Sequence, residues 1–362
     1  MKKLVFLLLA ICAAGISHET ITTTVLFDRE IVRILDKHCV MCHVENGPAF
    51  ALSTYEQTWL QKRPIRAAVI ARHMPPWAAV SGYGQFLNEN NLTLRETQFI
   101  ISWVEGLGPR NAGTVFTNTA IAAARPKEIE AHTDFGHWQL GEPQTKHPLP
   151  AATIEPDADS IQVTVSDLGL ASERLLRALE FMPGDRRVVR AAFFTIQETG
   201  QWIGSWTPWY GYMSLPKGAA YRLPAGSHIR AEIHYRGAKE RVIERGTVGL
   251  FFADPSAKDL ISDVVVERQT RLVADTSIVA LRPEIQAGVK SIEVSARKPD
   301  GSTEILLFAK DIPIDWPTPY ILKEPVALPR GTVLSVTAHG GGVRLTASTF
   351  TTRRPGPGSP RR

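Results

Sequence analysis

The chain has 362 residues, of which 44% are apolar and 21% are charged. This composition excludes a disordered chain and a coiled coil, and the length suits two or three domains that each bury a core. The formal net charge is +5, but six basic residues lie at the two ends of the chain, and without those six the body carries about −1. A nearly neutral body gives no electrostatic case for nucleic-acid binding.

Residues 1–17 have the pattern of a secretion signal peptide. Lys2 and Lys3 form a basic start, an apolar stretch follows, and Gly15-Ile16-Ser17 offers small residues for cleavage. The apolar stretch is too short for a membrane anchor, and Ile11 before Cys12 disfavours lipidation of that cysteine. We therefore expect export to the periplasm, with no transmembrane segment after the signal is removed.

The mature chain then keeps two cysteines, Cys39 and Cys42, and His43 follows at once. Cys-x-x-Cys-His is the pattern of covalent c-type haem attachment. Two thiols at this spacing reach the two vinyl groups of one haem, and His43 is then the proximal iron ligand. A thioredoxin-like redox pair usually follows a strand, and a zinc site needs a second ligand pair that this chain lacks. The pattern therefore favours a single covalent haem.

The residues around this motif predict an all-α cytochrome c domain over residues 18–110. Residues 93–96 (Thr-Leu-Arg-Glu) form a capping box that begins a helix, and Gly106 and Gly108 end it. Apolar residues recur at helical spacing on both sides of the motif. They are Phe27, Ile31, Ile34 and Leu35 before it, and Ile100, Trp103, Val104 and Leu107 after it.

A second iron ligand is expected between these helices. Residues 72–77 read Arg-His-Met-Pro-Pro-Trp, and a methionine thioether is a soft ligand that suits haem iron, while two prolines fix its loop. Met74 is our predicted distal ligand. His73 is the alternative, and Met74 packing on the haem edge without coordination is another. Met41 lies inside the attachment motif and does not easily reach the distal face.

The rest of the chain has the pattern of β-structure. Residues 111–136 have few bulky apolar side chains and are expected to be a linker, and residues 351–362 are expected to be a disordered basic tail. Between them, apolar and polar residues alternate with Pro/Gly punctuation, which predicts short strands in β-sandwiches. The alternating apolar residues include Ile161, Val163 and Val165, then Ile229, Ala231, Ile233 and Tyr235, and a hairpin is expected around a Lys-Pro-Asp-Gly-Ser turn at 298–302.

The haem motif, the segment at 72–77 and the closing helix with Trp103 and Val104 resemble the cytochrome c domain of a bacterial fusion family. In that family, the haem domain precedes a module similar to the copper type II ascorbate-dependent monooxygenases, such as peptidylglycine α-hydroxylating monooxygenase. The resemblance implies two tandem jelly-roll-like β-sandwich domains, at residues 137–265 and 266–350.

The resemblance also implies copper-ligand positions, and here the sequence departs from the family. The family's His-His pair corresponds to Arg190 and Ala191, and its His-x-His pair corresponds to Glu284 and Gln286. No methionine follows Met213, so only His234 matches a copper ligand. Alanine has no donor atom and arginine stays protonated, so we expect no copper. His234, together with the unpartnered His228 and His339, is then expected to be structural.

Three functions compete. The first is an electron-transfer cytochrome that serves a periplasmic redox partner protein and carries a degenerate, non-catalytic β module. The second is a copper-dependent, ascorbate-type monooxygenase with the haem domain as its built-in electron donor. The third is a haem-based sensor or a structural envelope protein. The missing copper ligands disfavour the second, and a methionine ligand that fills the sixth iron position disfavours the third. The aromatic residues at 202–212 can line a binding surface, although core packing is their commoner role.

Overall fold

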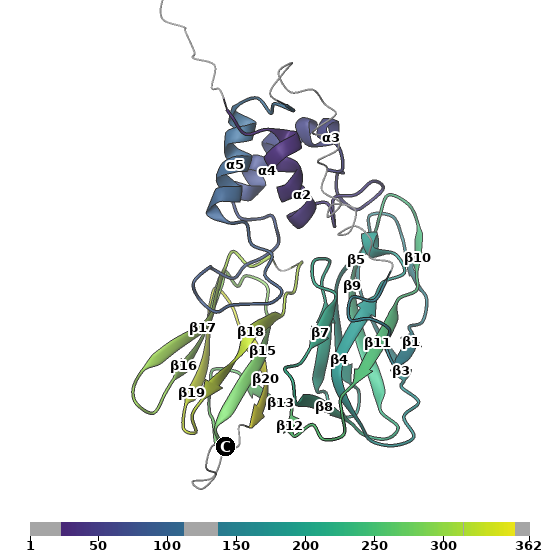
Figure 1. The fold of residues 1–362 in the computed structure, drawn as a ribbon, viewed down its shortest axis with the longest axis vertical. Coiled ribbons are helices and arrows are strands. Elements are labelled where there is room, and N and C mark those ends of the chain that lie inside the picture. The colour runs from purple at the N-terminus through teal and green to yellow at the C-terminus, as the bar shows by residue number, and fades with distance from the viewer. Residues whose placement is uncertain (1–22, 112–136, 314, 352–362) are drawn as a thin grey trace, which may run out of the picture.

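The structure is a computed structural model that describes residues 23–111, 137–313 and 315–351 (Figure 1). The expected signal peptide, Cys12, and nearly all of the expected linker and basic tail lie outside the described residues. A small helical region comes first, and several largely antiparallel sheets follow it. In the part of the chain that the structure describes, no helix is both long and apolar enough to cross a bilayer.

Short helices around one core form the helical region, residues 23–111. They are η1 (Phe27–Ile31, a π-helical turn), α2 (Val32–His38), α3 (Tyr55–Leu60), α4 (Lys62–Ile70) and α5 (Leu94–Glu105). The apolar stripe predicted before the haem motif is buried as expected, and Trp103 of α5 is fully buried against it. Burying large apolar side chains such as this one helps so small a region to gain stability.

Helix α5 begins where the sequence predicts. The Thr93 hydroxyl accepts a hydrogen bond from the Glu96 backbone at 3.1 Å, and the Glu96 carboxylate accepts one from the Thr93 backbone at 2.7 Å. The predicted place of Leu107 in the apolar stripe is wrong, because Leu107 is 66% exposed. The helix ends at Glu105, and Leu107 takes a positive φ of 68°, which turns its side chain away from the buried face.

The first β region comprises the strands up to residue 260. One sheet has the order β1-β11-β4-β8-β12 with β7 also on β4, a second has the order β3-β9-β5-β6, and β2 pairs with β10. The bounds are β1 (Thr145–Pro148), β2 (Ala152–Ile154), β3 (Asp159–Asp167), β4 (Arg174–Met182), β5 (Val189–Ile196), β6 (Trp202–Trp206), β7 (Tyr212–Ser214), β8 (Ala219–Leu223), β9 (His228–Arg236), β10 (Val242–Glu244), β11 (Thr247–Phe252) and β12 (Asp259–Leu260), with a 3₁₀ turn η2 (Arg186–Val188) before β5.

The second β region comprises the strands from residue 262 onward, with sheet orders β13-β20-β15-β18 and β14-β19-β16-β17. The bounds are β13 (Ser262–Val266), β14 (Gln269–Arg271), β15 (Thr276–Ile285), β16 (Ser291–Arg297), β17 (Thr303–Lys310), β18 (Tyr320–Leu328), β19 (Val333–His339) and β20 (Val343–Thr351). The predicted hairpin is present between β16 and β17, where the Lys298 backbone donates to the Ser302 carbonyl at 2.8 Å. Strand pairing thus changes region between Leu260 and Ser262.

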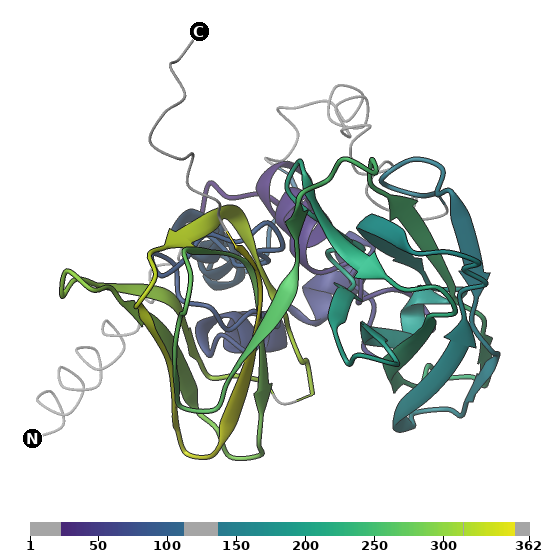
Figure 2. The same ribbon diagram turned by 90° about the horizontal axis from the view of Figure 1, so that it is seen from below.

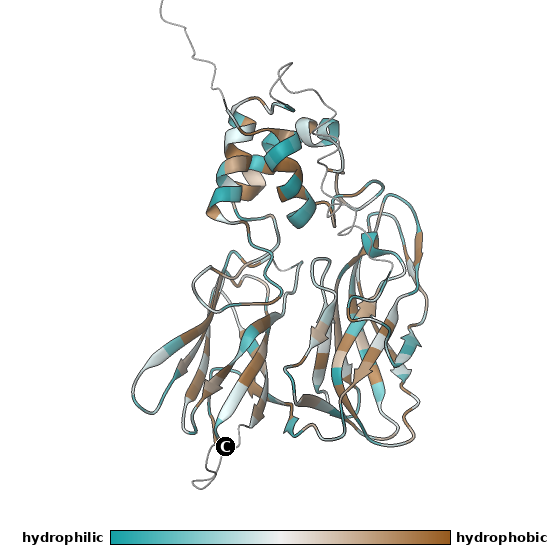
Figure 3. Ribbon diagram, viewed as in Figure 1, coloured by the Kyte–Doolittle hydropathy of each residue, from teal (hydrophilic) through white to brown (hydrophobic). Residues whose placement is uncertain are grey.

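The two β regions lie side by side, and the helical region covers one end of both (Figures 1 and 2). Apolar residues alternate with polar ones along many of their strands (Figure 3). The core of the first β region also contains Val279, Ala280 and Ile321 of the second, so the two regions are packed together. This packing gives the site described below two adjoining walls.

Two neighbouring strands show that alternation predicts a strand more reliably than it predicts the buried side. On β9 the predicted apolar residues, such as Ile233, are buried as expected. On β3, Ile161, Val163 and Val165 lie in a strand as expected but are 62%, 51% and 46% exposed. The register pairs Ile161 with His234, which places the apolar side of this edge strand with the polar outer side of β9.

The segment after Met74 ties the helical region to the second β region. Ala79 and Phe86 form single bridges with Ala309 of β17 and Leu322 of β18. Trp77 packs edge-on against Tyr320, with ring centroids 5.3 Å apart. Since Trp77 and Phe86 belong to the core of the second β region, the loop that carries Met74 is anchored outside its own helical region.

Candidate functional site

One cavity of about 230 Å³ is lined by all four residues that the sequence assigns to haem, Cys39, Cys42, His43 and Met74. Met41 lines it as well, whereas the alternative ligand His73 is exposed and does not. A larger cavity of about 730 Å³ lies between residues 77–89 and strands β17 and β18, and its lining contains no Cys, His or Met. Donor chemistry, rather than size, therefore identifies the site.

The two cysteines lie on consecutive turns at the end of α2. The backbone amide of Cys39 donates to Leu35, and the amides of Cys42 and His43 both donate to the Cys39 carbonyl, at 3.1 and 3.0 Å. The two thiols are not joined in a disulfide, and burial raises the pKa of each to about 12. Both thiols are therefore protonated at neutral pH, which is the opposite of the low-pKa thiolate that a thioredoxin-like redox pair needs.

His43 is held in one tautomer. Its Nδ1 lies 2.8 Å from the carbonyl oxygen of Phe50, and a carbonyl can only accept, so Nδ1 carries the proton. Nε2 is then the unprotonated nitrogen, which is the form that binds a metal. Burial also lowers the pKa of His43, which favours the neutral ring.

Met74 follows α4 in a loop whose backbone is fixed on both sides. The amide of His73 donates to the Ala68 carbonyl at 2.9 Å, and Pro75 and Pro76 after Met74 are buried. Met74 itself is 36% exposed although it is apolar, and it lines the cavity. An anchored loop that presents a thioether to a cavity is the arrangement expected of an iron ligand.

Two further residues that line the cavity, His38 and Asn90, could not be predicted from any sequence motif. His38 and Asn90 are both buried, and His38 Nδ1 lies 2.8 Å from Asn90 Oδ1. Asn90 Nδ2 has no hydrogen-bond partner among the described residues, although Asn90 is only 3% exposed. A buried amide donor needs an acceptor, and haem carries carboxylates, so Asn90 agrees with the thiols, imidazole and thioether in fitting a c-type haem.

The wall opposite the haem motif belongs to the β regions. Its residues are Arg186, Arg187, Val189, Arg190, Trp209, Arg236 and Trp316. The indole Nε1 of Trp209 donates to the Asn88 carbonyl at 3.0 Å, which links this wall to the segment before α5. Among the other aromatic residues of the 202–212 stretch, Trp202 and Trp206 are buried in the core, as expected for the commoner role.

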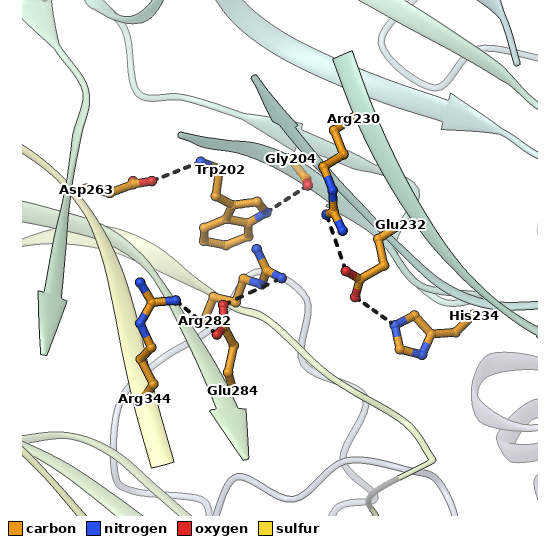
Figure 4. Close-up of polar contacts among 9 residues, drawn as sticks. All are labelled: Trp202, Gly204, Arg230, Glu232, His234, Asp263, Arg282, Glu284 and Arg344. Atoms are coloured by element: carbon orange, nitrogen blue, oxygen red, sulfur yellow. Dashed lines mark hydrogen bonds and ion pairs between the residues drawn. The ribbon is translucent and has the colours of Figure 1, made fainter. Parts of the chain in front are cut away.

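His234, the one residue that matches a copper ligand of the family that the sequence resembles, lies on the outer side of β9. Its cross-strand neighbour on β5 is Ala191. Its Nε2 lies 3.2 Å from a carboxylate oxygen of Glu232 (Figure 4). Its ring also packs edge-on against the Phe193 ring, with centroids 5.8 Å apart. Glu232 also lies 3.4 Å from Arg230, so His234 belongs to a chain of charged neighbours.

The hydrogen bond from His234 and the nearby charges of Arg282 and Arg230 lower the pKa of Glu232 to about 2, against the effect of burial. Glu232 is therefore a carboxylate throughout the physiological range. A carboxylate that already interacts with three basic side chains is a poor ligand for an added dication, because the cation must displace or repel them.

Glu284 and Gln286, which the resemblance aligns with the family's second pair of histidines, provide no imidazole. Glu284 of β15 forms ion pairs with Arg344 at 3.3 Å and with Arg282 at 3.7 Å (Figure 4). Gln286 accepts a hydrogen bond from the Gly342 amide at 3.3 Å. Across the residues that the structure describes, no three His, Cys, Asp or Glu side chains are grouped so that they could hold a metal ion.

The other two histidines that the sequence singled out, His228 and His339, lie near the surface. His228 Nδ1 lies 2.8 Å from the Glu198 carboxylate, and His339 ends β19 with its side chain exposed. Asp159 forms ion pairs with both Arg190 and Arg236, and Arg236 lies two residues from His234 on β9.

Comparison with known proteins gives little. No known family and no curated protein matches the chain. Among solved structures, the PBSX exported protein XepA is 10% identical with a TM-score of 0.16, covering 58% of this chain and 87% of that one. The CUB1-EGF-CUB2 domain of human MASP-1/3 is 8% identical with a TM-score of 0.14, covering 55% and 99%. An oxalate decarboxylase is 9% identical with a TM-score of 0.15, covering 58% and 74%.

Proposed function

We propose that this protein is an exported monohaem c-type cytochrome that transfers electrons to or from a periplasmic redox partner protein. The observation that carries the proposal is the convergence of Cys39, Cys42, His43 and Met74 on one cavity. These residues come from two segments that α3 and α4 separate in the chain, so their meeting is not a consequence of the motif alone.

Each residue has a role that its surroundings support. Cys39 and Cys42 form the thioether links, for which neutral, unoxidised thiols are the starting material. His43 presents Nε2 as proximal ligand, because Phe50 holds the proton on Nδ1. Met74 presents its sulfur as distal ligand from a loop anchored on the second β region. When bound, the haem supplies reversible one-electron transfer at iron, and a thioether ligand favours its reduced state.

For the β regions we propose two tandem jelly-roll-like sandwiches that form a non-catalytic docking or scaffold module. The ion pairs of Glu232 and Glu284 support this view. Glu284 stands at a position where the monooxygenase-like family needs a copper ligand, Glu232 is the neighbour of His234, and both carboxylates already pair with arginines. The other domain limits remain those predicted from the sequence, but strand pairing changes region between Leu260 and Ser262, a few residues before the predicted limit at 265. Export is directed by residues 1–17.

Metal analysis of the full chain, expressed with its export signal in a host that attaches haem, tests the proposal. We expect one iron per chain, no stoichiometric copper or zinc, and haem colour that stays with the protein on a denaturing gel after boiling in detergent. Loss of the colour on boiling contradicts the proposal. One copper per chain with ascorbate-dependent oxygen consumption restores the monooxygenase.

A further inference from the structure

Two tryptophans give the cavity of the haem motif an aromatic wall on the side of the β regions. Trp209 follows β6 in the first β region, and Trp316 precedes β18 in the second. Both line the cavity that Cys39, Cys42 and His43 also line. Both side chains are only half-buried, although an aromatic side chain stabilises a protein mainly through the apolar surface that it buries. Their remaining surface is available to a ligand that fills the cavity.

The backbone holds both tryptophans in fixed turns. The turn that carries Trp209 is closed by two hydrogen bonds between the backbones of Thr207 and Tyr210, at 2.9 and 3.0 Å. The amide of Trp316 donates to the Pro313 carbonyl at 3.0 Å. Fixed turns present both indoles in one arrangement, as a preformed binding wall requires.

The two indoles also join the three regions of the molecule. Their ring centroids lie 6.2 Å apart, so the wall passes from the first β region to the second. Trp209 packs against the core of the second β region, and its Nε1 donates to the Asn88 carbonyl at 3.0 Å. Asn88 is itself fixed at the start of β18, because its side chain donates to the Pro319 carbonyl at 2.7 Å and accepts from the Ile321 amide at 3.0 Å. The wall is therefore attached to the segment that links Met74 to α5.

The arginines of the same wall are held by partners within the β regions. Arg187 pairs with Asp185 at 2.6 Å, and Arg190 pairs with Asp159 at 3.3 Å. The guanidinium of Arg190 also lies 5.3 Å from the centre of the Trp316 ring. The two indoles, by contrast, carry no charge and offer apolar surface to the cavity.

We infer that Trp209 and Trp316 are positioning residues that close the haem crevice from the side of the β regions and keep water from the haem. The inference rests on the proposed function and deepens it. A haem is a flat and largely apolar ring system, and aromatic side chains pack well on such a surface. The apolar surroundings of a metal site control its access to solvent and its dielectric, and hence its reduction potential. Oxidised iron carries one more positive charge than reduced iron, so a crevice without water disfavours the oxidised state and raises the potential.

In this arrangement, the β module completes the haem site without binding copper. The helical region attaches the haem through Cys39 and Cys42, and the β regions supply the wall that shields it. Since Met74 lines the same cavity, a closed crevice also slows the entry of small molecules that compete with its sulfur for the iron.

Redox titration of the full-length holoprotein, followed by its absorption spectrum, tests the inference. Trp209→Ala and Trp316→Ala should each lower the reduction potential, and the double variant should lower it further. Trp209→Phe and Trp316→Phe keep an aromatic ring and should keep most of the wild-type potential. Trp59→Ala is the matched control, because Trp59 is 40% exposed, donates its Nε1 to the Leu107 carbonyl at 3.1 Å and lies outside the cavity.

Imidazole binding to the oxidised haem gives a second readout. Both alanine variants should bind imidazole several-fold faster than the wild type, because the crevice is then open to solvent, and the far-red methionine band should be intact before imidazole is added. Circular dichroism and urea unfolding check the fold of each variant. Where an alanine variant does not accumulate as folded holoprotein, leucine at the same position also removes the ring and is measured in its place.

The outcomes separate the two proposals. Holoprotein with an unchanged potential and unchanged imidazole binding in both alanine variants overturns the inference but leaves the cytochrome standing. An equal fall in Trp209→Phe and Trp209→Ala also overturns it, because the hydrogen bond to Asn88 rather than the ring surface is then responsible. Absence of covalent haem in the wild type removes the proposed function and the inference with it.

Discussion

The cavity at Cys39 and the outer side of β9 at His234 both contain metal-ligating residue types, but their side chains are arranged in opposite ways. In the cavity, the hydrogen bond to Phe50 leaves Nε2 of His43 as the unprotonated nitrogen, and the Asn90 amide has no partner among the described residues. On β9, by contrast, a ring nitrogen of His234 lies within hydrogen-bond distance of Glu232, and Glu232 also forms an ion pair with Arg230. The cavity therefore keeps donor groups available for a ligand, whereas the polar groups around His234 are already paired with one another.

The difference teaches that a retained histidine is not a retained site. A metal ion needs several donor groups that are not already paired with other cations. The free energy of desolvating a metal ion beside fixed cations is larger than the free energy that binding to one imidazole provides. Arg282 of β15 pairs with Glu284 of the same strand (Figure 4). Arg282 also lies 4.7 Å from the centre of the Phe193 ring of β5, so a cation of the second β region packs on an aromatic ring of the first.

The largest expected effect in this comparison comes from the thiols. Replacing both Cys39 and Cys42 by alanine should abolish covalent haem and leave the helical region without its central group. A denaturing gel stained for haem peroxidase activity measures the loss, with the wild-type protein boiled in the same detergent as the control. Retention of a stained band in the double variant would mean that haem is attached elsewhere.

Next in size is the effect of Met74→Ala. Removal of a distal thioether should lower the reduction potential and open the iron to carbon monoxide or imidazole, and the far-red sulfur-to-iron band of the oxidised wild type should disappear. The matched control is His73→Ala, which changes an exposed neighbour outside the cavity and should leave both properties unchanged. A wild-type spectrum of bis-histidine character would contradict the assignment.

On the other side of the comparison, Glu232→Gln should destabilise the protein by about 1–3 kcal/mol at pH 7, because it leaves three basic neighbours without their carboxylate. The pKa of Glu232 is lowered from 4.5 to about 2 in the folded state, so its contribution is present above pH 4.5 and is lost as the pH falls from 4.5 toward 2. Urea unfolding of both proteins across that range measures it.

The control for this pH dependence is Glu173→Gln, since Glu173 forms an exposed pair with Arg222 at 3.7 Å. It should change the free energy of unfolding by less than about 0.5 kcal/mol at any of these pH values. A Glu232→Gln protein as stable as the wild type at pH 7 would show that the charge chain at His234 does not hold this face together.

The smallest effect is expected on the edge strand beside His234. Ile161→Ala should cost less than about 1 kcal/mol, because the side chain is 62% exposed. Ile233→Ala, on the buried side of β9, should cost about 2–5 kcal/mol. Comparable losses in thermal or urea unfolding would mean that the apolar side of β3 is covered in solution.

Much of the helical region could be predicted, because its signals are local. The capping box at Thr93, the helical spacing before Cys39 and the haem motif each depend on residues only a few positions apart. Leu107 shows where a local signal fails, since its spacing fits the stripe but a positive φ after Gly106 removes it from the helix. The strands were equally visible, but β3 shows that alternation leaves open which side is buried.

The sequence by itself determined the thiols, the imidazole and the thioether as candidates, and it determined the absence of imidazoles at Arg190, Ala191, Glu284 and Gln286. Only the tertiary structure decided that Met74 meets the haem motif in one cavity and that Arg186 and Asn90 complete its walls. The physical reason is distance along the chain. A ligand motif or a helix cap is fixed by neighbours in sequence, whereas a cavity wall forms only when separate regions pack together, here through Trp77 on the second β region and Trp209 on Asn88.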